Sequence, residues 1–98
     1  MAIERARIKD KFNSYAHLAR HKKEGVHYSV VVREVPKSKV AIVAPHGGMI
    51  EWNTERMARE IAANDHNLYA FSGKGEDAFE ELHVTSTRFD EPRALAVV

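Results

Sequence analysis

Apolar side chains recur along the chain with two spacings, which divide it into short helices and strands. They lie three and four residues apart over residues 13–23 and 53–63, which predicts two amphipathic helices. Residues 26–35 alternate between apolar and mostly polar positions, and this pattern predicts a strand near a sheet edge. Residues 40–44 form an unbroken apolar run, typical of a strand buried on both faces at the centre of a sheet.

The second half of the chain continues in the same way. Residues 68–71 predict a short strand, residues 76–82 a helical turn, and residues 82–87 a fourth strand rich in β-branched side chains. Pro92 suits the first position of a final helix, where an amide would have no partner. This order predicts one α/β domain over residues 1–98, with a mixed, mostly parallel central sheet flanked by helices.

The turn that follows the long apolar run carries the clearest chemistry. Pro45 cannot donate to a ladder and is expected to end the strand, while Gly47 and Gly48 permit a tight turn. Open α/β sheets bind ligands at the carboxyl ends of their strands, and here His46 is followed by Glu51. Because zinc accepts imidazole and carboxylate ligands in hydrolytic sites, this pair predicts a zinc site. The alternative is an ordinary turn histidine followed by an acid that leads into a helix.

Four blocks of sequence connect this turn to a known family. They are Asp10-Lys-Phe-Asn-Ser-Tyr-Ala-His-Leu, Glu24-Gly-Val-His-Tyr, Ala44-Pro-His-Gly-Gly-Met-Ile-Glu and Leu82-His-Val-Thr-Ser-Thr-Arg-Phe-Asp-Glu-Pro. Together, and in this order, they resemble the phage-type poly-γ-glutamate hydrolases, zinc enzymes with a carboxypeptidase-A/phosphorylase-like core. The resemblance implies that His46 and Glu51 are the first two zinc ligands.

The third ligand is less simply placed. The resemblance implies a histidine on a later strand, in residues that would follow Val98. The chain closes on an apolar run, Ala-Leu-Ala-Val-Val, and the related enzymes are longer, so we expect a domain that is truncated at its C-terminus. His83 belongs to a different block. It could complete the metal shell, contact the substrate or pack beside the sheet, and we favour the last reading.

Charged residues near the turn are candidates for the other roles. Arg56 falls on the first turn of the helix over residues 53–63, whose N-terminus attracts anions, and Arg88 has a planar fork that suits a carboxylate. Both are candidate substrate-binding residues. Asp90 and Glu91 are candidates for the general base by position only. Ordinary solvated side chains are the alternative reading of all four.

Other histidines and glycines carry weaker signals. His17 and His21 would share a helix face, but neighbouring lysines and arginines oppose a cation, which favours a solvated face. His27 is expected to face solvent. The glycine-rich loop over residues 72–75 lacks the spacing of a phosphate-binding loop.

Composition narrows the classes of function. A net charge of +1 with scattered basic residues does not indicate nucleic-acid binding, and the absence of cysteine excludes disulfides, thiolate zinc sites and cysteine nucleophiles. The charged N-terminus has no apolar signal core, and no apolar run approaches the ~20 residues of a membrane span. We therefore expect a cytoplasmic protein, released where phage-induced lysis occurs, without membrane contact.

Together the patterns and the resemblance predict a zinc-dependent hydrolase that cleaves γ-glutamyl amide bonds in poly-γ-glutamate or a related acidic peptide. One alternative is an inactive truncated domain that only binds an acidic polymer. Another is an amidohydrolase of a different N-acyl amino acid. For these 98 residues alone we expect weak metal binding and little activity. An unpaired sheet edge predicts self-association.

Overall fold

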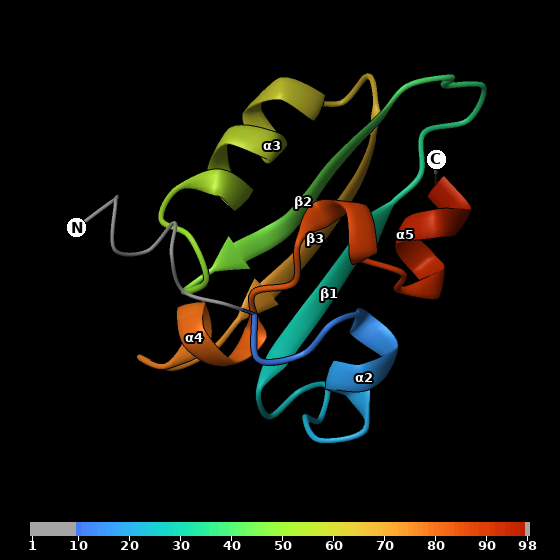
Figure 1. Cartoon of the computed structure of the whole chain (residues 1–98). Coiled ribbons are helices and arrows are strands. Elements are labelled where there is room, and N and C mark those ends of the chain that lie inside the picture. The colour runs from blue at the N-terminus through green and yellow to red at the C-terminus, as the bar shows by residue number, and fades with distance from the viewer. Residues whose placement is uncertain (1–9, 98) are drawn as a thin grey trace.

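A mixed three-stranded sheet with helices on both faces organises the chain (Figure 1). The computed structural model describes residues 10–97, so most of the charged N-terminal segment, where we expect no export signal, lies outside the described residues. The elements are α2 (Tyr15–Ala19), β1 (Tyr28–Arg33), β2 (Ala41–Gly48), α3 (Thr54–Ala62), β3 (Asn67–Gly73), α4 (Ala78–Leu82), the 3-10 helix η1 (Ser86–Arg88) and α5 (Pro92–Val97). The predicted α/β class is confirmed. No helix in this part of the chain has the length and apolar character to cross a bilayer.

The central strand is β3, because its side chains are buried on both faces. Tyr69 and Phe71 point to one face, Leu68 and Ala70 point to the other, and all four are at most 1% exposed. The strand order is β1-β3-β2, with β1 antiparallel and β2 parallel to β3. The segment β2–α3–β3 therefore forms the βαβ unit that the sequence predicted.

The prediction that residues 40–44 form the centre of the sheet is wrong for the described residues. β2 lies at an edge, and its apolar residues are mostly half-buried. The outer flank of β2 is bordered by exposed apolar side chains, with Met57 53% and Ile61 60% exposed. An unbroken apolar run cannot by itself distinguish a central strand from an edge strand that has apolar neighbours.

Two hydrophobic clusters hold the helices against the sheet. Ala58 and Ala62 of α3 pack on the face of Leu68 and Ala70. On the opposite face α2, α4, α5 and the segment before η1 cover a larger, aromatic cluster (Figure 1). In that cluster the Phe71 ring lies 4.6 Å from the Tyr28 ring and 5.1 Å from the Phe89 ring, measured between centroids. Such aromatic pairs each stabilise a core by about 0.5–1.5 kcal/mol beyond burial.

The predicted fourth strand over residues 82–87 does not form. Leu82 ends α4, residues 83–85 run extended without a ladder, and η1 follows. The apolar pattern itself was informative, because the Val84 side chain is fully buried in the aromatic cluster. The backbone groups of this segment instead bond to polar side chains.

The predicted helices exist, with different ends. α2 is shorter than residues 13–23, and the Ser14 side chain caps it by accepting from the His17 amide. α3 follows Asn53, which has a left-handed backbone (φ 71°) and makes no side-chain cap bond. α5 begins at Pro92 as expected.

Replacing Gly48 should test how closely β2 and β3 approach at their carboxyl ends. Gly48 has φ +62°, and a Cβ there would lie 2.5 Å from the Gly73 carbonyl oxygen. We expect Gly48→Ala to lower the free energy of unfolding by about 2–4 kcal/mol, measured by urea denaturation. Gly75→Ala is the matched control, since Gly75 has φ +89° but open space around it, and should cost about 1–2 kcal/mol. Equal losses of unfolding free energy in the two variants would show that the close approach of Gly48 to Gly73 does not determine the cost of the substitution.

Candidate metal centre

A bulge in β2 accommodates Pro45. Ala44 pairs with Ala70, and the next pair is Gly47 with Ser72, so β2 advances three residues where β3 advances two. Pro45 was predicted to end the strand, but it lies within this bulge and β2 continues to Gly48. A bulge tolerates proline because the ladder bond that proline cannot donate is already absent there.

The extra residue decides which way His46 points. Gly47 faces α3, as does its partner Ser72, whose hydroxyl donates to Glu55. His46 therefore points to the opposite face. Without the bulge, His46 would oppose Ser72 and point at α3, because a shift of one residue exchanges the two faces of a strand.

The turn after β2 brings Glu51 back beside His46. The His46 carbonyl accepts from the Glu51 amide (3.0 Å) and from the Thr54 hydroxyl (2.8 Å), which closes the loop. The Ile50 side chain is fully buried and anchors the loop. As a result His46 Nδ1 and Glu51 Oε1 lie 3.2 Å apart. The two residues that the sequence singled out thus meet at one point.

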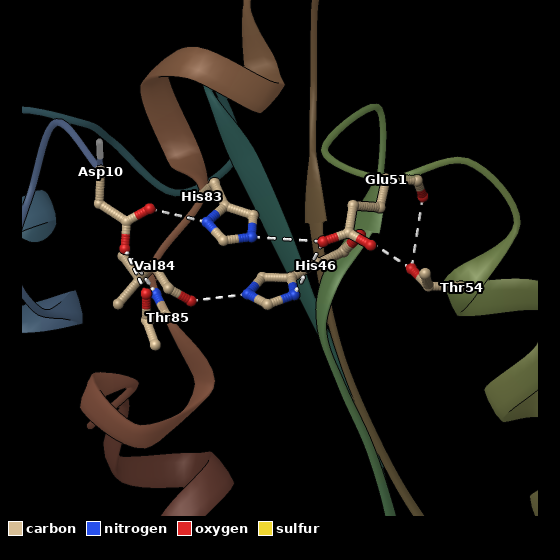
Figure 2. A network of polar contacts seen from close by, with 7 residues as sticks. All are labelled: Asp10, His46, Glu51, Thr54, His83, Val84 and Thr85. Carbon is tan, nitrogen blue, oxygen red and sulfur yellow. Dashed lines mark hydrogen bonds and ion pairs between the residues drawn. The ribbon is translucent and has the colours of Figure 1, made fainter. Parts of the chain in front are cut away.

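A backbone carbonyl fixes the tautomer of His46. Its Nε2 lies 2.6 Å from the Val84 carbonyl oxygen, which can only accept, so Nε2 carries the proton (Figure 2). Nδ1 is left with a lone pair directed at Glu51. Burial lowers the pKa of His46 by disfavouring the imidazolium form, against an opposing effect of the Val84 bond. A neutral ring with an available lone pair is the form that binds metals.

His83 lies beside this pair; the sequence left its role open between the metal shell, the substrate and packing beside the sheet. Its ring stacks on the His46 ring, with centroids 4.0 Å apart and planes 16° apart. His83 Nε2 lies 3.3 Å from Glu51 Oε1, and Nδ1 lies 2.8 Å from Asp10 Oδ1 (Figure 2). The favoured reading, in which His83 packs beside the sheet, therefore misses its polar contacts. Asp10 and His83 stand in two of the four resemblance blocks, which is the signal that could have found them.

The three side chains can hold one cation. One ligand atom from each of His46, Glu51 and His83 lies within 4.8 Å of the other two. The two nitrogen–oxygen separations, 3.2 and 3.3 Å, are close to the edge of a tetrahedron with zinc–ligand bonds of 2.0–2.1 Å, which is about 3.4 Å. In the described part of the chain, this is the group that suits a tetrahedral metal.

The other predicted residues lie elsewhere. Arg56 is exposed and its Nε lies 3.2 Å from Glu60, and Arg88 is exposed in η1. Asp90 accepts from the Ala16 amide at 3.2 Å. Glu91 is fully buried and bonds to Arg93, so neither Asp90 nor Glu91 reaches the cluster as a general base.

The remaining histidines lie outside the cluster. The rings of His17 and His21 lie 5.0 and 5.3 Å from the Phe12 ring and serve packing. His27 is half-buried rather than directed to solvent, and its Nδ1 accepts from the Lys23 amide at 2.9 Å.

Sequence comparison relates the chain to longer proteins. A family model described as poly-gamma-glutamate hydrolase matches residues 12–98. In Bacillus subtilis (strain 168), the SPbeta prophage-derived UPF0714 protein YoqZ is 38% identical over 86 residues, which cover 88% of this chain and 30% of YoqZ. The UPF0714 protein YndL of the same strain is 46% identical over 68 residues, or 69% of this chain and 26% of YndL. The chain thus spans a third or less of these two relatives.

Two solved structures likewise match most of this chain and less than half of their own length. A bacteriophage poly-gamma-glutamate hydrolase matches with a TM-score of 0.82 and 31% identity, over 91% of this chain and 43% of the phage chain. A zinc-free apo structure of YndL matches with a TM-score of 0.79 and 38% identity, over 90% of this chain and 42% of YndL's.

The lowered pKa of His46 makes a prediction for the chain held in chelator. We expect the His46 ring to titrate below its ordinary value of 6.5, followed by NMR. At a pH between the folded-state pKa and 6.5, the folded chain then binds fewer protons than the unfolded chain. The free energy of unfolding should therefore fall as the pH drops from about 6.5 towards the folded-state pKa. Glu51→Gln removes a charge that favours the imidazolium and should lower the midpoint further. A midpoint above 6.5 would contradict the dominance of burial.

Proposed function

Because the chain belongs to the poly-gamma-glutamate hydrolase family, as its sequence blocks predicted, we propose that it carries the zinc-binding turn of a hydrolase that cleaves γ-glutamyl amide bonds in poly-γ-glutamate. The observation that carries the proposal is the meeting of His46 Nδ1 and Glu51 Oε1 at the carboxyl end of β2. The zinc-free YndL structure supports zinc as the ion. We further propose that β2–α3–β3 is part of a carboxypeptidase-A-like core.

The chemistry of the donors fits a cation. The Nδ1 lone pair of His46 and the carboxylate of Glu51 are both acceptors, and they face each other at 3.2 Å. Two buried or half-buried acceptors without a donor between them are unfavourable, and a divalent ion removes this conflict. Borderline-soft zinc accepts both nitrogen and oxygen ligands at such a site.

These contacts indicate what each group would do at the site. A bound zinc ion would polarise the amide carbonyl of a substrate and make water more acidic. The Val84 carbonyl and the fold of β2 hold the His46 ring, and the Thr54 hydroxyl holds the loop that carries Glu51. These contacts are made before a substrate arrives, so little reorganisation is needed at the moment of reaction.

A hollow beside the turn offers room for an acidic chain. It has a volume of about 380 Å³ and is lined by Gly48, Trp52, Asn53, Glu55, Arg56 and Arg59. Arg59 is already bonded to Glu55, whereas Arg56 pairs with the exposed Glu60 and can turn towards a carboxylate. The N-terminus of α3 adds a favourable field for anions. Arg88 is a second candidate for substrate carboxylates, on the strength of its planar fork.

Zinc content tests the metal, and polymer cleavage tests the reaction. We expect the chain to bind about one zinc ion and to shorten poly-γ-glutamate slowly, as followed by gel filtration. His46→Ala should lower zinc affinity by about 100-fold or more and abolish cleavage, because it removes a ligand. His21→Ala, which changes an exposed histidine outside the cluster, is the matched control.

Two results would contradict the proposal. A chain that takes up no zinc, or that binds it equally well as His46→Ala, would remove the metal site. Zinc binding dependent on His46, with the polymer left intact, would reject hydrolysis by this chain and favour the binding-only alternative.

Arg56→Gln should weaken polymer binding without changing zinc affinity. An exposed charge contributes about 0.2–1 kcal/mol, so we expect a loss of affinity of about 1.4- to 5-fold, measured by isothermal titration with poly-γ-glutamate. The effect should shrink as salt is added, because salt screens exposed charges. Arg20→Gln, at the end of α2, is the control. Equal effects of the two variants would leave only a general charge contribution.

A further inference from the structure

The indole of Trp52 lies on the surface, in the turn between β2 and α3. It is 87% exposed, more than any other large apolar side chain in the part of the chain that the structure describes. Tryptophan is ordinarily well buried, because its large apolar surface gains much from leaving water. A single apolar side chain on a surface does not by itself indicate a ligand. The rigidity of the turn and the charges around the indole therefore decide what Trp52 can do.

The turn is held in place on both sides of Trp52. Before it, the Ile50 side chain is fully buried and the Ile50 amide donates to the Gly47 carbonyl at 3.2 Å. After it, the Thr54 hydroxyl donates to the His46 carbonyl at 2.8 Å. A ligand that contacts the indole therefore has little backbone left to order, which reduces the entropy lost on binding.

Positive charge lies beside the indole. Trp52, Arg56 and Arg59 all line the hollow of about 380 Å³ next to the turn. Glu55, an acidic group in the same lining, is compensated by Arg59, whose Nη2 and Nε lie 2.9 and 3.0 Å from Glu55 Oε2. Arg56 pairs with Glu60, but both side chains are mostly exposed and water weakens the pair. The hollow thus combines an apolar plate with a cation that an anion can recruit.

The repeat unit of poly-γ-glutamate has the complementary groups. Each unit carries a carboxylate, a pair of methylene groups and a planar amide. The methylene groups and the amide plane can pack on an aromatic face, while the carboxylate pairs with a guanidinium. A polyanion without an apolar stretch can use the cation but not the indole.

We propose that Trp52 is a substrate-contacting residue, whose indole packs on the methylene and amide groups of one repeat unit while Arg56 pairs with the carboxylate of that unit. The inference rests on the proposed function, because it takes the polymer from it. It assigns a role in binding to a side chain that holds no metal. It also predicts that the chain selects polymers by their apolar groups as well as by their charge.

The fluorescence of the indole reports the contact directly, because Trp52 is the only tryptophan of the 98 residues. The emission of the zinc-loaded chain should resemble that of free tryptophan in water and be quenched readily by acrylamide, since the side chain is 87% exposed. Saturating poly-γ-glutamate should shift the emission to shorter wavelength. It should also lower the quenching constant about twofold, because one of the two faces of the ring is covered.

Variants separate the apolar contact from the charge. Trp52→Ala should lower the affinity for poly-γ-glutamate about 2- to 10-fold, measured by isothermal titration, and leave zinc affinity unchanged. Trp52→Phe keeps an aromatic face and should lose less. Leu95→Ala, which removes a 60% exposed apolar side chain on α5, is the matched control and should change neither affinity. Inorganic polyphosphate has charge without methylene groups, so Trp52→Ala should bind it as tightly as the unchanged chain does.

The outcomes separate this inference from the proposed function. If the polymer binds without changing the emission of Trp52, or binds Trp52→Ala as tightly as the unchanged chain, the role of Trp52 is overturned and the hydrolase proposal stands. Equal losses for poly-γ-glutamate and polyphosphate in Trp52→Ala would also overturn it, because methylene groups would then not be the cause. If the unchanged chain binds no poly-γ-glutamate, the proposed function fails together with the inference. Circular dichroism establishes that each variant is folded.

Discussion

A single backbone carbonyl, that of Val84, joins the hydrophobic core to the polar cluster. The Val84 side chain is fully buried among the aromatic residues, while its carbonyl oxygen lies 2.6 Å from the His46 ring. A buried donor or acceptor left without a partner costs about 1–3 kcal/mol, so the core and the ring each stabilise the position of the other. The site is therefore set by packing as well as by its own polar bonds.

The parts of the structure that sequence could predict are those fixed by local pattern. The βαβ unit and the start of α5 at Pro92 followed from periodicity and from the chemistry of proline. His46 and Glu51 came from one turn, where the ligand types, two glycines and a strand end all stand within a few residues. That they converge reflects bonds within the same turn, since the His46 carbonyl accepts from the Glu51 amide.

The parts that sequence did not predict depend on contacts between distant segments. Residues 82–87 have the pattern of a strand, but the Val84 carbonyl and the Thr85 amide bond to side chains instead of to a neighbouring strand. His83 acquires its place from Asp10, far away in the sequence. The edge position of β2 also depends on distant segments, because it is set by the pairing of β3 with β1 on one side and with β2 on the other.

The bulge in β2 has a consequence for how this segment can vary. One additional residue between Ala44 and Gly47 turns the imidazole away from α3 and towards the Val84 carbonyl. Deleting a single residue there would keep every chemical group of the centre, but the imidazole ring would then point to the face of the sheet that α3 covers. The length of this segment is thus under as strict a constraint as its composition, so relatives that share the site should differ here by substitution and not by insertion or loss.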